Sequence, residues 1–130
     1  MQIQIGHANR ERDLATIQLP GDVQAGVWAH SHTGEDAVIM ARHVPIVSHY
    51  AQRNTVWFPP TANPQMLVDG IQLYKVDYLI VVVRGDSYYV PRDEDSFAFL
   101  YKSHSDKLHL VHDASELKSY QVIVRTVQTQ

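Results

Sequence analysis

The sequence contains no cysteine. This absence excludes disulfide bonds, thiolate metal sites and a thiol nucleophile, and it leaves the redox compartment open. The sequence also lacks a cluster of basic residues, and its 11 Lys and Arg against 14 Asp and Glu give a formal net charge of -3. Because binding to a phosphate backbone requires clustered basic side chains, we expect no nucleic-acid partner.

Long hydrophobic runs are also missing. The longest strongly apolar run covers residues 78–83 and is far too short to cross a bilayer. The first residues, MQIQIGHANRER, lack both the apolar core and the small-residue cleavage site of a secretion signal. The chain is therefore expected to be soluble. Its 130 residues, 45 % of them hydrophobic, predict one α/β domain over residues 22–130, preceded by a loosely attached lead-in at residues 1–21.

Strand and helix patterns alternate in the first two thirds of this domain. Continuous apolar runs predict strands at residues 37–42 and 77–83, and a short aromatic segment predicts a strand at residues 55–58. Helical spacing of apolar residues predicts helices at residues 22–32, 44–51 and 64–74. Such alternation favours an open sheet whose parallel strands are joined by right-handed crossovers.

Proline residues mark one corner of this sheet. Pro59 and Pro60 must end the second strand, since neither can donate a backbone hydrogen bond. Asn63 can then cap the next helix, which has a proline at its first position. The side chains of Trp57 and Phe58 should alternate between the sheet faces and belong chiefly to the core.

The same patterns predict which side of each helix is buried. Val23, Val27 and His30 share one face of the first helix, with Trp28 beside them. The third helix has a buried stripe at helical spacing, formed by Met66, Leu67, Ile71 and Tyr74.

In the last third of the chain, strands and helices no longer alternate. Residues 93–102 predict a helix, and residues 108–113 and 120–127 predict a hairpin joined by ASELKS. The predicted fold is therefore a small Rossmann-like open sheet, with three parallel strands, crossover helices and a C-terminal antiparallel hairpin.

Eight histidines raise the question of a metal site. His30 and His32 are two residues apart on a predicted helix, so their side chains point roughly 200° apart and cannot share an ion. His109 and His112 are three apart in a predicted strand and face opposite sides. No HExxH or comparable spacing occurs, so we expect no metal.

Cofactor and catalytic motifs are missing as well. The segment after the first strand, RHVPIVSH, contains no glycine, so we expect neither a dinucleotide nor any other cofactor. Ser48, His49 and Asp69 could form a triad on paper, but the sequence has no GxSxG elbow. No catalytic residue is assigned, and whether the chain belongs to an enzyme is left open.

Open α/β sheets bind ligands beyond the carboxyl ends of their strands. The candidate ligand-binding residues at this rim are Arg42, His43, Thr61, Asn63, Arg84 and Asp86. Two arginines there would favour an anionic group, such as a carrier phosphate or a lipid headgroup. In the alternative interpretation, the arginines pair with Asp36, Asp86 or other carboxylates at the surface and need no ligand.

A family resemblance extends over residues 22–126. It is carried by the blocks WAHSHTGEDAVIMAR, SHYAQRNTVWFPPTANPQMLVDGI, YKVDYLIVVV, FAFLYKSHSDKLHLVHD and YQVIV. They resemble the soluble C-terminal extracytoplasmic domain of membrane glycosyltransferases of the GT-C type, relatives of the dolichyl-phosphate-mannose protein mannosyltransferases and aminoarabinose transferases. The positions that match the family pattern are Trp28, Thr33, Arg42, Tyr50, Arg53, Pro59, Asp77 and Tyr78. Ala29 and Gln52 stand where that pattern has Ile and Gly.

The resemblance implies a function for a larger parent protein. Such a parent moves a sugar from a polyprenyl-phosphate carrier to an acceptor, with catalytic acidic residues in its membrane portion. This chain would be a non-catalytic accessory domain on the extracytoplasmic face. Its partners would be the membrane-embedded portion and a lipid-linked sugar or acceptor. The alternative is a free-standing α/β binding module, or a small enzyme that uses the rim.

Overall fold

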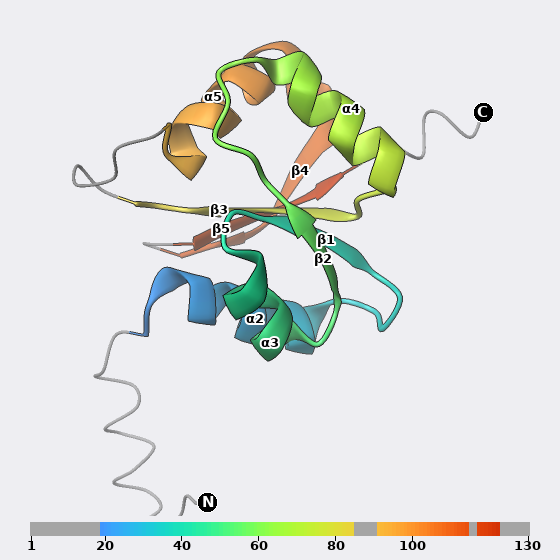
Figure 1. Cartoon of the computed structure of the whole chain (residues 1–130), viewed down its shortest axis with the longest axis vertical. Helices are drawn as coiled ribbons and strands as arrows, with labels where there is room; N and C mark the ends of the chain where they lie inside the picture. Colours follow the sequence, from blue (N-terminus) through green and yellow to red (C-terminus); the bar gives the residue numbers. More distant parts are fainter. Residues whose placement is uncertain (1–18, 85–90, 115–116, 123–130) are drawn as a thin grey trace, which may run out of the picture.

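The computed structural model describes residues 19–84, 91–114 and 117–122. Its strands form one open five-stranded sheet in the order β2-β1-β3-β5-β4 (Figure 1). β1 pairs in parallel with β2 and β3, whereas β5 pairs antiparallel with β3 and β4. The predicted fold class is confirmed. The strand bounds are β1 Val38–Ala41, β2 Asn54–Trp57, β3 Tyr78–Val82, β4 Leu108–Asp113 and β5 Leu117–Val122.

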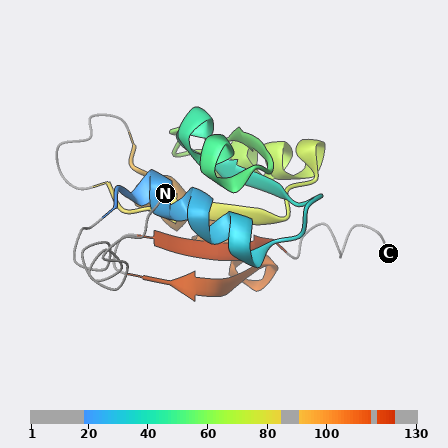
Figure 2. The same cartoon turned by 90° about the horizontal axis from the view of Figure 1, so that it is seen from below.

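Two pairs of helices cover the sheet. α2 and α3 lie on one face and α4 and α5 on the other, as Figure 1 shows, and Figure 2 looks onto the side of α2 and α3. A short 3-10 helix, η1, links α5 to β4. The helix bounds are α2 Gly21–His32, α3 Val44–Ala51, α4 Pro64–Tyr74, α5 Asp93–His104 and η1 Ser105–Lys107.

Each face of the sheet has its own apolar cluster. In β1, Met40 belongs to the cluster under α4 and α5, whereas Ile39 and Ala41 belong to the cluster under α2 and α3. In β3, Leu79 belongs to the cluster under α4 and α5, and Ile80 belongs to the cluster under α2 and α3. Because successive side chains of a strand point to opposite faces, a strand covered on both sides must be apolar throughout. This explains the two continuous apolar runs in the sequence.

The helix ends follow from local chemistry. α4 begins at Pro64, and the side chain of Asn63 accepts a hydrogen bond from the Gln65 N–H at 3.0 Å, as predicted. Gln52 caps the end of α3 and Lys75 caps the end of α4, and their φ angles of 53° and 55° are left-handed. Glycine is the usual residue in this conformation.

The predicted buried face of α2 is wrong. Val27 is 45 % exposed and His30 is exposed, whereas Ala25, Gly26 and Ala29 are buried. The small residues permit a close approach to α3, and a Cβ atom at Gly26 would lie 2.5 Å from the Cβ of Tyr50. The face of α2 is therefore selected by how closely two backbones can approach, a property that hydrophobic spacing does not measure.

Two aromatic residues also differ from the prediction. Trp57 is 59 % exposed because β2 is an edge strand, whereas the neighbouring Phe58 is fully buried. Tyr74 is 54 % exposed and Met66 is 52 % exposed, and Val68 is buried in their place on α4.

The second strand of the hairpin begins earlier than predicted, and the structure describes only the last residues of the predicted lead-in. β5 begins at Leu117, three residues before the predicted start, because Leu117 pairs with Val82 and is buried. The predicted lead-in, residues 1–21, lies outside the described residues as far as residue 18, and its last residue, Gly21, begins α2.

Candidate functional site at the carboxyl edge of the sheet

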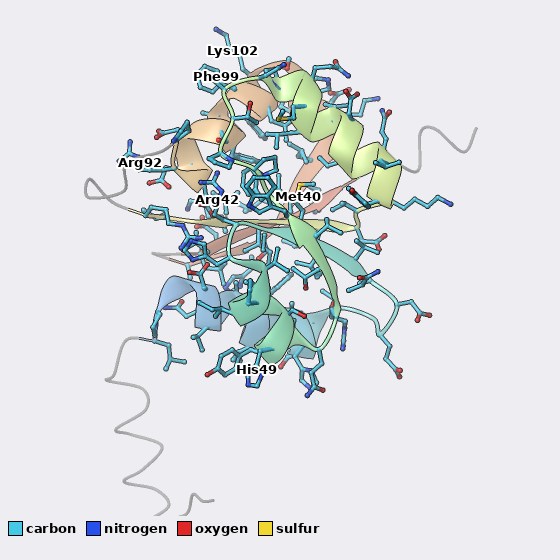
Figure 3. All side chains as sticks on the ribbon, in the orientation of Figure 1. Met40, Arg42, His49, Arg92, Phe99 and Lys102 are labelled. Carbon is cyan, nitrogen blue, oxygen red and sulfur yellow. The ribbon has the colours of Figure 1, made fainter. Side chains whose placement is uncertain are left out.

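The candidate site lies where β1 and β3 end side by side. From β1 the chain continues through α3 to β2, and from β2 it returns through α4 on the other face to β3. This reversal is the topological switch point at which open α/β sheets bind ligands. Arg42 and His43 follow β1 here, and Arg84 follows β3. Figure 3 shows Arg42 at this edge, close to the start of α5.

Arg84 connects two helices that lie on opposite faces of the sheet. Its Nη1 and Nη2 atoms each donate to a carboxylate oxygen of Asp22, on α2, at 2.8 Å. Its Nε donates to Asp93 Oδ1, on α5, also at 2.8 Å. The side chains of Arg84, Asp22 and Asp93 are only 8 %, 10 % and 0 % exposed. The guanidinium is therefore buried between two carboxylates.

Arg42 makes the corresponding links from β1. Its Nε donates to the carbonyl oxygen of Phe58 at 2.7 Å, and its Nη1 donates to that of Pro91 at 2.6 Å. The Nη1 atom also lies 3.6 Å from Asp93 Oδ1, and the guanidinium sits 4.9 Å from the centre of the Phe58 ring. Arg42 thus ties the ends of β1 and β2 to the start of α5.

The other rim residues are less deeply buried. The Nδ1 atom of His43 lies 2.9 Å from Asp22 Oδ2, and the side chain of His43 is 40 % exposed. The N–H of Thr61 donates to Ser96 Oγ at 3.2 Å. Asn63 is exposed and caps α4. Asp86 lies outside the described residues.

Burial and charge act in opposite directions on this network. Burial alone would raise the pKa of Asp22, but hydrogen bonds and the charge of Arg84, together with His43, lower it below its ordinary value. Burial alone would lower the pKa of Arg84, but the hydrogen bonds to Asp22 and Asp93 raise it. Both groups are therefore ionised at neutral pH. The first turns of α2 and α5, where the carboxylates lie, also favour negative charge.

The structure brings together most of the predicted rim. Arg42, His43 and Arg84 join one network of hydrogen bonds and ion pairs. Ser96 extends this network, because its Oγ lies 3.5 Å from Arg42 Nη2 and accepts a hydrogen bond from the N–H of Thr61. Sequence reasoning missed its two carboxylates, Asp22 and Asp93, as partners. Asp22 lies inside the first turn of α2 and binds the side chains of His43 and Arg84. An acidic residue in the first turn of two predicted helices was the available signal.

The structure also shows where the residues of the rejected triad and of the rejected histidine pair lie. Ser48 and His49 lie on α3 and Asp69 lies on α4, on opposite faces of the sheet, so they form no triad. His30 Nδ1 lies 3.2 Å from the Ala51 carbonyl oxygen, and His32 Nδ1 lies 2.9 Å from that of Trp28.

The described residues contain neither a metal-binding cluster nor a helix suited to span a membrane. Across residues 19–84, 91–114 and 117–122, no group of three or more His, Cys, Asp or Glu side chains could hold a metal ion. In the same part of the chain, no helix has the length and apolar character that a bilayer span requires.

Comparison with known proteins shows a likeness in structure but none in sequence. No protein-family model matches the chain, and no curated protein matches it in sequence. The fold defines an open, mixed α/β domain. It is similar to the C-terminal globular domain of an oligosaccharyltransferase from Archaeoglobus fulgidus, with a TM-score of 0.51 and 14 % sequence identity. The match covers 82 % of this chain and 99 % of that domain. At this identity the likeness establishes the fold alone.

Proposed function

We propose that this chain is an accessory domain of a membrane glycosyltransferase and is not catalytic by itself. The observation that carries the proposal is the structural likeness, which spans 99 % of a domain described as the C-terminal globular domain of an oligosaccharyltransferase. A second line of support is the sequence resemblance over residues 22–126, which rests on residue patterns. The two lines agree on the kind of parent protein.

The geometry of the rim fits an accessory role. Asp22, Arg42, Arg84 and Asp93 use their charged groups to hold the sheet edge and the starts of two helices together. Two guanidinium groups against two carboxylates leave the network close to neutral. A domain held in this way supplies a fixed shape, which is what a module positioned beside a membrane-embedded catalytic centre requires.

In the proposed parent, a sugar passes from a polyprenyl-phosphate carrier to an acceptor. The domain would lie on the extracytoplasmic face against the membrane-embedded portion, near the lipid-linked sugar or the acceptor. The rim remains a candidate for an anionic group there, with His43 as its most exposed basic side chain among Arg42, His43 and Arg84.

Activity measurements test this proposal. Purified chain incubated with a polyprenyl-phosphate-linked sugar and an acceptor should give no transfer, and membranes that contain the parent should give transfer. Replacing residues 22–126 of the parent with a flexible linker should lower its activity. Transfer by the purified chain would overturn the non-catalytic role, and full activity of the linker variant would overturn the accessory role.

A further inference from the structure

A groove of about 690 Å³ lies between the edge strand β2 and helix α4. Trp57, Met66 and Tyr74, which are more than half exposed, contribute apolar surface to it. We call this hollow the β2 groove. Its lining consists of Met40, Val56, Trp57, Pro59, Pro60, Thr61, Met66, Gly70 and Tyr74.

A second hollow of about 510 Å³ flanks the same strand on the side of α3. It shares Trp57 with the β2 groove and is otherwise lined by Arg42 to Ile46. The residues of the β2 groove belong to the α4 side of the sheet, where Met40 and Val56 pack. The two hollows therefore open on opposite faces of the sheet, one on each side of β2.

β2 is an edge strand, and β1 is the one described strand that pairs with it. Half of its backbone N–H and C=O groups therefore face away from the sheet, where another strand can pair with them. Side chains of an added strand would alternate between the two faces. Alternate side chains would thus enter the β2 groove and the hollow beside α3.

A glycine in the middle of α4 keeps the β2 groove open. Glycine inside a helix is less stabilising than alanine at the same position, so its presence calls for a reason. At Gly26 the reason is packing, because a Cβ atom there would lie 2.5 Å from the Cβ of Tyr50. At Gly70 a Cβ atom would lie 3.4 Å from the Cε of Met40, the far end of a flexible side chain, and would meet no backbone atom of the described residues outside its own helix within 4 Å. Close packing therefore explains why residue 26 is glycine. It does not explain why residue 70 is glycine, and we attribute that glycine to the groove that it lines.

Charge and polarity narrow the possible occupant. Among residues 19–84, 91–114 and 117–122, no Asp, Glu, Lys, Arg or His lines the β2 groove, so a charged side chain entering it would lose water without gaining a partner from these residues. The side-chain hydroxyls of the lining come from Thr61 and Tyr74, too few for a sugar with many hydroxyl groups. An acyl or isoprenoid chain would leave the outward backbone groups of β2 unpaired.

We propose that β2 and its two flanking hollows bind an extended peptide segment that adds to the edge of the sheet and carries apolar side chains at the alternate positions that enter the β2 groove. Backbone hydrogen bonds to β2 supply affinity, and the two hollows select the side chains. Pro59 and Pro60 end the strand and limit the paired segment to the length of β2. This inference does not depend on the proposed function.

A randomised heptapeptide library, selected on the immobilised full chain, tests the inference. Enriched peptides should have uncharged, apolar residues at alternate positions, which are the positions that enter the β2 groove. Titration of a synthetic enriched peptide should weaken by at least about tenfold in Gly70→Phe, which fills the groove, and in Trp57→Lys. The matched control is Leu73→Ala, on α4 at 72 % exposure but outside the lining, which should change affinity by less than about twofold.

Further readouts distinguish strand addition from other occupants. Bound peptide should slow amide hydrogen exchange within residues 54–57, and the thermal midpoint of each variant shows that it is folded. Three outcomes would overturn the proposal: no enrichment relative to folded Trp57→Lys, enriched peptides that leave β2 exchange unchanged, and a concentration-dependent dimer that Trp57→Lys abolishes while no peptide binds. The last outcome would assign the edge to a second copy of the chain.

Discussion

Arg84 and Asp22 are 62 positions apart in the sequence, yet they face each other in a bidentate ion pair with both nitrogen–oxygen distances at 2.8 Å. The pair joins the end of β3 to the first turn of α2, and Asp93 extends it to α5. Because all three side chains are buried, removing one charge leaves another without compensation. The rim therefore contributes to the stability of the fold.

Replacing Arg84 tests this directly. Arg84→Gln should lower the free energy of unfolding by about 3–5 kcal/mol, because two buried carboxylates lose their main partner. The control is Arg92→Gln, whose pair with Asp95 is more exposed, at 31 % and 41 %, and which should cost less than about 1 kcal/mol. Urea denaturation measures both. An interpretation of Arg84 as a solvated rim side chain predicts nearly unchanged folding, and equal, small losses in the two variants would support that interpretation instead.

The lowered pKa of Asp22 predicts a dependence of stability on pH. Its unfolded value is 3.8 and its folded value is lower, so the stabilisation is fully present above pH 3.8 and disappears as pH falls through the folded pKa. In Asp22→Asn this contribution is absent at every pH. The difference in unfolding free energy between wild type and Asp22→Asn, followed by urea denaturation from neutral pH into the acid range, should therefore shrink below pH 3.8. A difference that stays constant with pH would show that the charge of Asp22 is not responsible.

Two adjacent aromatic residues should respond very differently to truncation. Phe58 is fully buried in the cluster under α4 and α5, so Phe58→Ala should cost about 3–5 kcal/mol of unfolding free energy. Trp57 is 59 % exposed, so Trp57→Ala should cost less than about 1 kcal/mol. Thermal and urea unfolding of the pair give the comparison. Similar losses for both would mean that Trp57 is covered in solution.

Close packing between α2 and α3 predicts a sensitive glycine. Gly26→Ala should destabilise the fold by about 1–3 kcal/mol, because the new methyl group would overlap Tyr50 and force the helices apart. Gly34→Ala is the matched control, since a Cβ atom there would meet nothing within 4 Å. Differential scanning fluorimetry of both variants should show a lower midpoint for Gly26→Ala alone. A Gly26→Ala variant as stable as wild type would contradict the helix contact.

The fold was predictable largely because buried parallel strands have a distinctive sequence. The runs that became β1 and β3 are apolar on both faces, and Asn63 with Pro64 marks the start of α4. The exposure of Trp57 was not predictable in this way. Alternation tells which face a side chain points to, but the position of β2 at the sheet edge depends on the strand order.

The candidate site was predictable in part for a similar reason. The rule that strand ends gather at one edge correctly placed Arg42, His43 and Arg84 together. Their bonds to Asp22 and Asp93 could not be predicted, because they depend on where two helices from opposite faces begin. No local pattern in the sequence relates residues separated by so many positions.

The most direct test of the account is the size and location of the polypeptide that carries this domain in its own cells. An antibody raised against the purified chain can be used to blot fractionated cell extracts. The account predicts a membrane-bound band much larger than the 14.8 kDa of this chain, resistant to carbonate extraction because it contains several spans of about 20 apolar residues. A band near 14.8 kDa in the soluble fraction, with none in the membranes, would contradict it.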